Sequence, residues 1–239
     1  MPHIKFKLKN ERPFRLVPSE NGKHVFGGDS TIAGLSPKTC EVPCQQIFLF
    51  DLTDESFPIE TSEACASLPL IYPLKYGGGG PEIQYAVHSD REIEILHLSE
   101  DVADETQWQY LQVDSLPTMR FDLVPLFYEE ARYITFMRED GFFQPSDEDR
   151  VIAKRLNDNG FIPVGGRRNY IVNAGTIVCR NPACTRFGKP TRFELLTMVP
   201  PISVNGTDDF WYEFQGGDVD FCFGFCKECG TIISFNVAG

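Results

Sequence analysis

Apolar and polar residues alternate along several short segments in the first half of the chain, and this pattern predicts β-strands. In residues 4 to 8 the apolar side chains alternate with lysine, as in a half-buried or edge strand. Residues 45 to 52 form a short apolar run that is typical of a strand inside a sheet. Further strands are predicted around Ile71, over residues 83 to 87 and over residues 91 to 99.

Strand patterns also dominate the end of the chain. Residues 18 to 43 are rich in glycine, serine and proline and are expected to form a loop. After residue 160 the alternating and apolar runs return. They predict strands over residues 170 to 178, 192 to 199, 210 to 214, 219 to 225 and 231 to 235.

Helical patterns are sparse. Residues 125 to 137 are compatible with a helix that has Pro125 near its start. A stronger pattern covers residues 146 to 158, where Ser146 is a suitable N-cap and acidic residues fill the first turn. One face of this helix is expected to carry Val151, Ile152 and Leu156.

The predicted class is α+β, dominated by antiparallel sheet. A boundary near residues 140 to 145 would divide the chain into a β-rich half, residues 1 to 144, and a second half, residues 145 to 239, although one continuous domain is the alternative. The two halves also repeat a cysteine pair, a strand, a proline, paired glycines and an aromatic strand in the same order. If this is an internal duplication, Cys40 and Cys44 are the relic of an incomplete site.

Composition is that of an ordinary globular protein, with 42% hydrophobic and 23% charged residues among 239. No apolar run approaches the roughly 18 residues that a membrane span needs. We therefore expect a cytoplasmic protein without a signal peptide, a transmembrane helix or a membrane partner. In a reducing compartment, paired thiols are expected to hold metal or to do redox chemistry, and not to form structural disulfides.

The cysteines of the second half have the spacing of a metal site. Four residues separate Cys179 from Cys184, and two separate Cys226 from Cys229. Two such turns can direct four sulfurs toward one tetrahedral ion, as in a zinc ribbon. Thiolate ligands select Zn²⁺ over Mg²⁺ or Ca²⁺, and iron stays open as an alternative. Four thiolates close the coordination sphere, so the predicted zinc is structural and no catalytic residue is predicted.

Two other interpretations of these cysteines stay open. Cys226 and Cys229 alone would fit a redox pair, but such pairs lie at a helix N-terminus, whereas Gly230 and the β-branched residues after it predict a turn into a strand. Buried, inert thiols are the other interpretation. Cys222 lies on the same predicted strand face as Cys226 and could replace a ligand. None of the four histidines lies near either cysteine pair in the sequence.

Charge distinguishes between partners. With 22 basic and 34 acidic residues the net charge is −12, which repels nucleic acid and anionic membranes. One basic segment interrupts this pattern and contains no acidic residue: Arg167, Arg168, Arg180, Arg186, Lys189 and Arg192. It could offset the −2 charge of zinc with four thiolates and donate to the sulfurs, or it could dock an acidic peptide, a protein or RNA. The candidate partner-binding residues are Arg167, Arg168, Tyr170 and Arg186.

Several motifs resemble a known family. The chain contains GFIPVGGRRNYI, CRNPAC, RFELLTMVPP and WYEFQGGDVDFCFGFCKECG in this order. These motifs resemble the bacterial YwqG-like family of uncharacterised proteins and are similar to the C-terminal domain of the programmed cell death protein 2 family. The matching positions are Gly165, Gly166, Phe193, Glu194, Pro200 and the four cysteines. The chain departs from the family pattern at Arg168, Tyr170 and Val172, and its first cysteine turn is two residues longer.

The resemblance implies a β-rich fold without known catalysis, and in eukaryotic relatives a chaperone-like role toward a newly made ribosomal protein. An acidic protein suits this role because ribosomal proteins are basic. The leading hypothesis is thus a zinc-binding protein-interaction module, acting as a chaperone or an immunity-type inhibitor. The alternatives are nucleic-acid binding through residues 167 to 192 and an enzyme whose site residues are scattered along the sequence.

Overall fold

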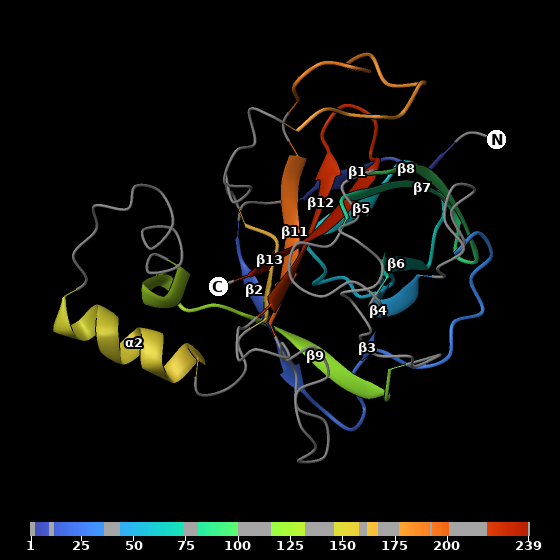
Figure 1. The fold of residues 1–239 in the computed structure, drawn as a ribbon. Coiled ribbons are helices and arrows are strands. Elements are labelled where there is room, and N and C mark those ends of the chain that lie inside the picture. The colour runs from blue at the N-terminus through green and yellow to red at the C-terminus, as the bar shows by residue number, and fades with distance from the viewer. Residues whose placement is uncertain are drawn as a thin grey trace, which may run out of the picture.

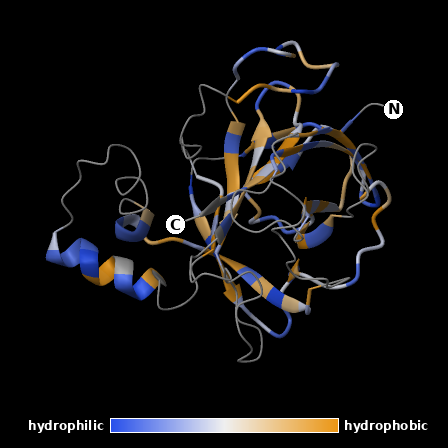
Figure 2. Ribbon diagram, viewed as in Figure 1, coloured by the Kyte–Doolittle hydropathy of each residue, from blue (hydrophilic) through white to orange (hydrophobic). Residues whose placement is uncertain are grey.

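The computed structural model describes residues 3 to 9, 12 to 35, 44 to 73, 81 to 99, 116 to 131, 146 to 157, 162 to 166, 177 to 191, 193 to 200 and 219 to 238. Strands dominate these residues and form the body of the molecule (Figure 1). Apolar residues are concentrated in this body, whereas helix α2 (Asp147–Asn157) lies to one side and is largely hydrophilic (Figure 2).

The described strands form one large sheet and one small one. The strands are β1 (Phe6–Leu8), β2 (Phe14–Pro18), β3 (His24–Phe26), β4 (Gln45–Asp51), β5 (Ile59–Thr61), β6 (Ser67–Tyr72), β7 (Ile83–Ser89), β8 (Glu92–Leu98), β9 (Met119–Pro125), β10 (Ile162–Val164), β11 (Phe193–Val199), β12 (Val219–Cys226) and β13 (Ile232–Ala238). β1 pairs with β5, and the other strands form an 11-stranded sheet in the order β6-β4-β3-β9-β2-β10-β11-β12-β13-β7-β8. Every pairing between named strands is antiparallel.

Most of the predicted strands are confirmed. β1, β4, β6, β7, β8, β11, β12 and β13 lie within a few residues of the predicted segments. The predicted strand over residues 210 to 214 and most of that over residues 170 to 178 lie outside the described residues. The fold is more β than α+β, because α2, with 11 residues, is the longest helix among those described.

One prediction in the first half is wrong, and another begins at the wrong residue. β3 lies within the expected loop over residues 18 to 43, because His24 and Phe26 alternate with Val25 and are buried against the neighbouring strands. Pro125 ends strand β9, and the helical residues 128 to 131 lie inside the helix predicted over residues 125 to 137, whose remaining residues from 132 on lie outside the described part of the chain. The residues before Pro125 alternate in burial around Phe121, Pro125 itself lies opposite Phe14 of β2, and the Leu126 amide makes the next hydrogen bond, to the Pro13 carbonyl at 3.2 Å.

Strands from both halves of the chain pair in the large sheet. β2 from the N-terminal half pairs with β10, and β13 from the C-terminal half pairs with β7. The hydrogen-bonded ladder therefore continues across the predicted boundary near residues 140 to 145. The division into two halves and the internal duplication remain predictions.

Helix α2 begins as predicted. The Oγ atom of Ser146 accepts a hydrogen bond from the Asp149 amide at 3.2 Å, and the Asp149 carboxylate accepts one from the Ser146 amide at 2.9 Å. Leu156 is buried, but Val151 is 69% exposed. Five residues correspond to a rotation of about 140° on a helix, so these two side chains cannot share a narrow apolar face, and the predicted face is wrong in this respect.

The buried apolar residues form two clusters. The larger fills the body of the sheet and includes Phe26, Phe48 and Phe223. The smaller contains the four predicted metal ligands together with Ile177, Phe193 and Ile233. In the described part of the chain, no helix combines the length and the apolar character that crossing a membrane requires.

Candidate metal centre

Each cysteine pair lies in a hydrogen-bonded turn. In the first turn the Cys184 amide donates to the Asn181 carbonyl at 2.9 Å, and the Gly188 amide donates to the Cys179 carbonyl at 3.0 Å. In the second turn, which joins β12 to β13, the Gly230 amide donates to the Cys226 carbonyl at 2.7 Å. These bonds close both turns and direct their sulfurs to one point.

Gly230 is required by the second turn. Its φ is +77°, a conformation that disfavours residues with a side chain. A Cβ atom there would lie 2.6 Å from Cα of Lys5, near the start of β1. The turn therefore needs glycine both for its backbone conformation and for its close contact with the N-terminal segment.

The four sulfurs have the separations expected around a tetrahedral ion. The Sγ atoms of Cys179, Cys184, Cys226 and Cys229 all lie within 4.8 Å of one another. The Cys179 and Cys229 sulfurs are 3.7 Å apart, and the Cys184 and Cys226 sulfurs are 3.9 Å apart. A Zn–S bond of about 2.3 Å with tetrahedral angles gives sulfur–sulfur distances of about 3.8 Å. A disulfide requires about 2.05 Å, and the described cysteines form none.

All four cysteines are buried, so negative charge on their thiolates is costly in free energy. The exposed fractions of Cys179, Cys184, Cys226 and Cys229 are 0%, 6%, 0% and 3%. Interactions with the thiols of Cys179 and Cys229 hold the pKa of Cys226 well below its ordinary value, because these thiols stabilise the Cys226 thiolate. The same contacts with Cys226 and Cys229, together with burial, raise the pKa of Cys179, so several thiolates at once would require a divalent cation to neutralise them.

Neutral donors surround the sulfurs. The Arg186 amide donates to Cys184 Sγ at 3.4 Å, and Asn181 Nδ2 lies 3.9 Å from Cys229 Sγ. The Thr231 hydroxyl is 3.1 Å from the same sulfur. The expectation that arginine side chains donate to the sulfurs is wrong for Arg186, whose guanidinium donates to the Pro190 carbonyl at 2.8 Å.

His3 was missed by the sequence analysis. Its Nε2 atom lies 2.8 Å from the carbonyl oxygen of Cys229, 226 positions along the chain. A carbonyl oxygen only accepts, so Nε2 carries the proton and donates to it. Asn181 Nδ2, which is 3.4 Å from the same nitrogen, donates instead to the Thr231 hydroxyl at 2.8 Å. His3 therefore fastens the N-terminal segment to the second cysteine turn.

Gln84 on β7 was missed as well. Its side chain is fully buried; Nε2 donates to the Val178 carbonyl at 2.8 Å, and Oε1 accepts from the Arg180 amide at 2.8 Å. Nε2 also donates to the Glu82 carboxylate at 2.6 Å. Gln84 thus holds the backbone on both sides of Cys179, and a strand of the first half orients a ligand of the second.

The remaining described cysteines lie outside the cluster. Cys222 is not part of the four-sulfur group. It lies four residues before Cys226 on β12, a distance of about 13 Å along the strand. The pKa of Cys65 is raised to about 12, mainly by burial and secondly by its hydrogen bond with Asp90. This thiol is therefore unreactive. Cys44 is buried in the main core. Cys40 lies outside the described residues.

The candidate partner-binding residues are only partly described. Arg186 is exposed on the first cysteine turn. Arg167, Arg168, Tyr170 and Arg192 lie outside the described residues. Gly165 and Gly166, the paired glycines of the family pattern, have φ values of +67° and +89° after β10. Close contacts with Pro58 and Pro13 leave no room for side chains there.

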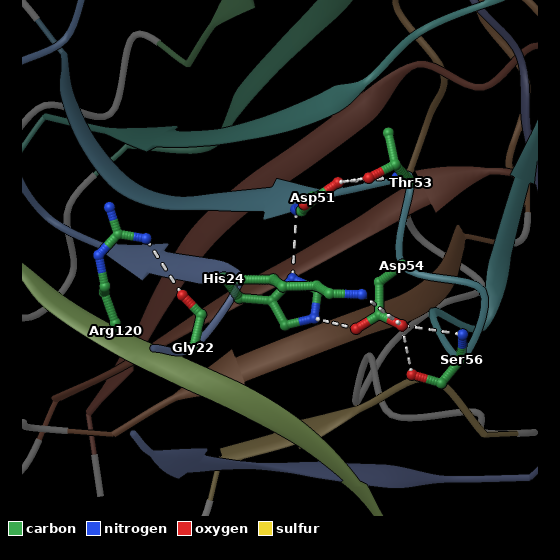
Figure 3. A network of polar contacts seen from close by, with 8 residues as sticks. Gly22, His24, Asp51, Thr53, Asp54, Ser56 and Arg120 are labelled. Carbon is green, nitrogen blue, oxygen red and sulfur yellow. Dashed lines mark hydrogen bonds and ion pairs between the residues drawn. The ribbon is translucent and has the colours of Figure 1, made fainter. Parts of the chain in front are cut away.

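Half-buried and exposed polar residues surround the buried His24 on β3 (Figure 3). Its Nδ1 atom accepts a hydrogen bond from the Asp51 amide at 3.2 Å, which places the ring proton on Nε2. Nε2 lies 3.5 Å from a carboxylate oxygen of Asp54. Burial lowers the pKa of His24 despite the nearby carboxylates. The Asp54 carboxylate in turn accepts hydrogen bonds from the hydroxyl and amide of Ser56.

The comparisons with known proteins identify no relative. No family model matches the chain, and no curated protein or solved structure matches it. The resemblance to the YwqG-like family therefore remains a prediction.

Proposed function

We propose that the chain is a zinc-binding protein in which a structural Zn²⁺ stabilises a non-catalytic module that binds another protein in the cytoplasm. The convergence of four buried sulfurs at tetrahedral separations supports the metal site. Cys179, Cys184, Cys226 and Cys229 would hold the ion. Four thiolates leave no position for water or substrate, so the ion would support the fold and would not catalyse.

The ligand set favours Zn²⁺. Four sulfur ligands in tetrahedral arrangement suit zinc or iron, whereas Mg²⁺ and Ca²⁺ require oxygen ligands. Elemental mass spectrometry on protein purified without chelator would show one zinc per chain. Co²⁺ bound in place of zinc would give the visible absorption of a tetrahedral thiolate complex.

Matched cysteine variants test the ligand assignment. Cys229→Ser should lower the zinc content severalfold or more, because serine does not replace a thiolate ligand. Cys222→Ser changes a buried cysteine on the same strand as Cys226 and should retain one zinc per chain. Metal-free wild-type protein, or equal zinc loss in both variants, would contradict the proposed ligands.

Charge supports a basic protein partner. A net charge of −12 attracts basic proteins through long-range electrostatics. A chaperone-like protein that shields a basic client would use this field, in line with the role that the family resemblance implies. A pull-down at low salt should retain a basic protein that elutes as salt rises. Recovery of no protein under these conditions would refute this part of the proposal.

A further inference from the structure

The first cysteine turn presents an aromatic ring among positive charges. Phe187 is 51% exposed, which is unusual among the described phenylalanines. Arg180, Arg186 and Lys189 are exposed on the same turn, and residues 177 to 191 contain no acidic residue. We call Arg180, Arg186, Phe187 and Lys189 the knuckle surface. Its local charge is opposite to that of the whole chain.

The charges of the knuckle surface are available to a ligand. Among the described residues, no carboxylate forms an ion pair with Arg180, Arg186 or Lys189. Lys227 on the second turn differs, since it pairs with Glu194 at 3.5 Å. Three cations also exceed the −2 charge of zinc with four thiolates, so neutralising the metal site does not account for all of them.

Backbone hydrogen bonds hold this surface in shape. The Phe187 amide donates to the Cys184 carbonyl, the Gly188 amide to the Cys179 carbonyl and the Lys189 amide to the Arg186 carbonyl, each at 3.0 Å. The Arg186 guanidinium is oriented by its bond to the Pro190 carbonyl and keeps further donors. A preformed surface loses little conformational entropy when a ligand binds.

We propose that the knuckle surface binds single-stranded nucleic acid, with one base stacked on Phe187 and the neighbouring phosphates contacted by Arg180, Arg186 and Lys189. An exposed ring between cations matches the alternation of base and phosphate along a single strand. An acidic peptide would use the cations and leave the ring without a matching group. Double-stranded nucleic acid would not offer an unstacked base. This inference goes beyond the proposed protein-binding function and uses a different surface property.

Fluorescence anisotropy of the zinc-loaded full chain with a labelled oligouridylate of about ten nucleotides tests the inference. Neutralising three phosphates predicts a slope of about −2 for the logarithm of the association constant against the logarithm of the salt concentration. Phe187→Ala should weaken binding about tenfold or more, because stacking of the base is lost. Phe187→Trp should keep the affinity of the wild type, because tryptophan also offers a ring on which a base can stack. Lys189→Gln should weaken binding and make the salt slope shallower.

Phe127→Ala is the matched control. Phe127 is 65% exposed beside Glu129 and Glu130, so its removal changes exposed aromatic area without touching the knuckle surface, and affinity should not change. Zinc content and melting temperature of Phe187→Ala should equal those of the wild type, which separates loss of stacking from loss of the metal site. No oligonucleotide binding at low salt, equal binding by Phe187→Ala, or equally tight binding of an oligoglutamate peptide would each overturn the inference. The zinc and pull-down measurements are separate, so any of these results leaves the proposed function standing.

Discussion

Replacing Gln84 by leucine should weaken both the fold and the metal site. Leucine has a similar volume but cannot bond the Val178 carbonyl or the Arg180 amide, which Gln84 holds at 2.8 Å each. A buried polar group left without its partner costs about 1–3 kcal/mol, so two such groups predict a loss of about 2–6 kcal/mol. Because the affected backbone carries Cys179, part of this loss should appear in metal binding. Each 1.4 kcal/mol or so corresponds to a tenfold weaker zinc affinity.

Gln46→Leu is the matched control for Gln84→Leu. Gln46 is also a buried glutamine, but its amide donates to the Gly27 carbonyl, away from the cysteine turns. This variant leaves one such group without its partner, so it should lose about 1–3 kcal/mol and keep its zinc affinity. The assays are urea unfolding at saturating zinc and competition for zinc with a coloured chelator. If both variants bind zinc equally tightly, Gln84 does not orient the ligand turn and the reasoning is refuted.

Four further predictions concern other parts of the same structure. Gly230→Ala introduces a side chain at a positive φ and in a close contact, so it should lower the free energy of unfolding by about 2 kcal/mol or more. Gly188→Ala introduces one at a φ of +68° but into open space, so urea unfolding should show a loss of only about 1–2 kcal/mol. His3→Ala should weaken zinc binding severalfold in chelator competition and leave one zinc per chain at saturation, since its bond to the Cys229 carbonyl positions a ligand. Because the pKa of His24 is lowered in the folded state, the unfolded chain binds more protons below pH 6.5. The free energy of unfolding should therefore be at its full value above pH 6.5 and should fall as the pH drops toward the folded-state pKa. His24→Asn should show a smaller decrease over this range in unfolding experiments, and a profile equal to that of the wild type would contradict the assignment. Chelation should increase hydrogen exchange at residues 177 to 191 and leave β4 protected, and uniform exchange would show that both clusters unfold together.

The clustering of the four cysteines could be predicted from the sequence because its signal is local. Each pair lies in one short turn, so the spacing of Cys179 from Cys184 and of Cys226 from Cys229 already limits where the sulfurs can point. The structure adds that both pairs meet, with all four sulfurs within 4.8 Å. Cys222 was ambiguous in the sequence because alternation places it on the face of Cys226. The distance between Cys222 and Cys226 along β12 places Cys222 outside the four-sulfur group.

The residues that support the ligands could not be predicted in this way. Gln84 reaches Val178 across 94 positions, and His3 reaches Cys229 across 226. Such contacts depend on the order of strands in the sheet, which places β7 beside β13, and no local pattern encodes that order. A buried glutamine in a strand pattern is the one available signal, because a buried amide requires partners.

The strand errors have a related cause. Proline at position 125 suggests a helix start, but it serves equally well as the last residue of a strand, and only the pairing of β9 with β2 distinguishes the two. β3 has three residues, fewer than the four that a periodicity argument needs. Tertiary pairing therefore decided both segments, and the mainly antiparallel class could be predicted without them.

The cluster around the cysteines contains few other apolar residues: Ile177, Phe193 and Ile233. Of these three apolar residues, only Ile177 belongs to residues 177 to 191, whereas Phe193 lies on β11 and Ile233 on β13. Ordering the backbone costs about 1–2 kcal/mol per residue, so burial of one isoleucine cannot hold this segment by itself. The proposed zinc would thus take the place of a larger hydrophobic core, and the turn that it would order is the one that carries the knuckle surface.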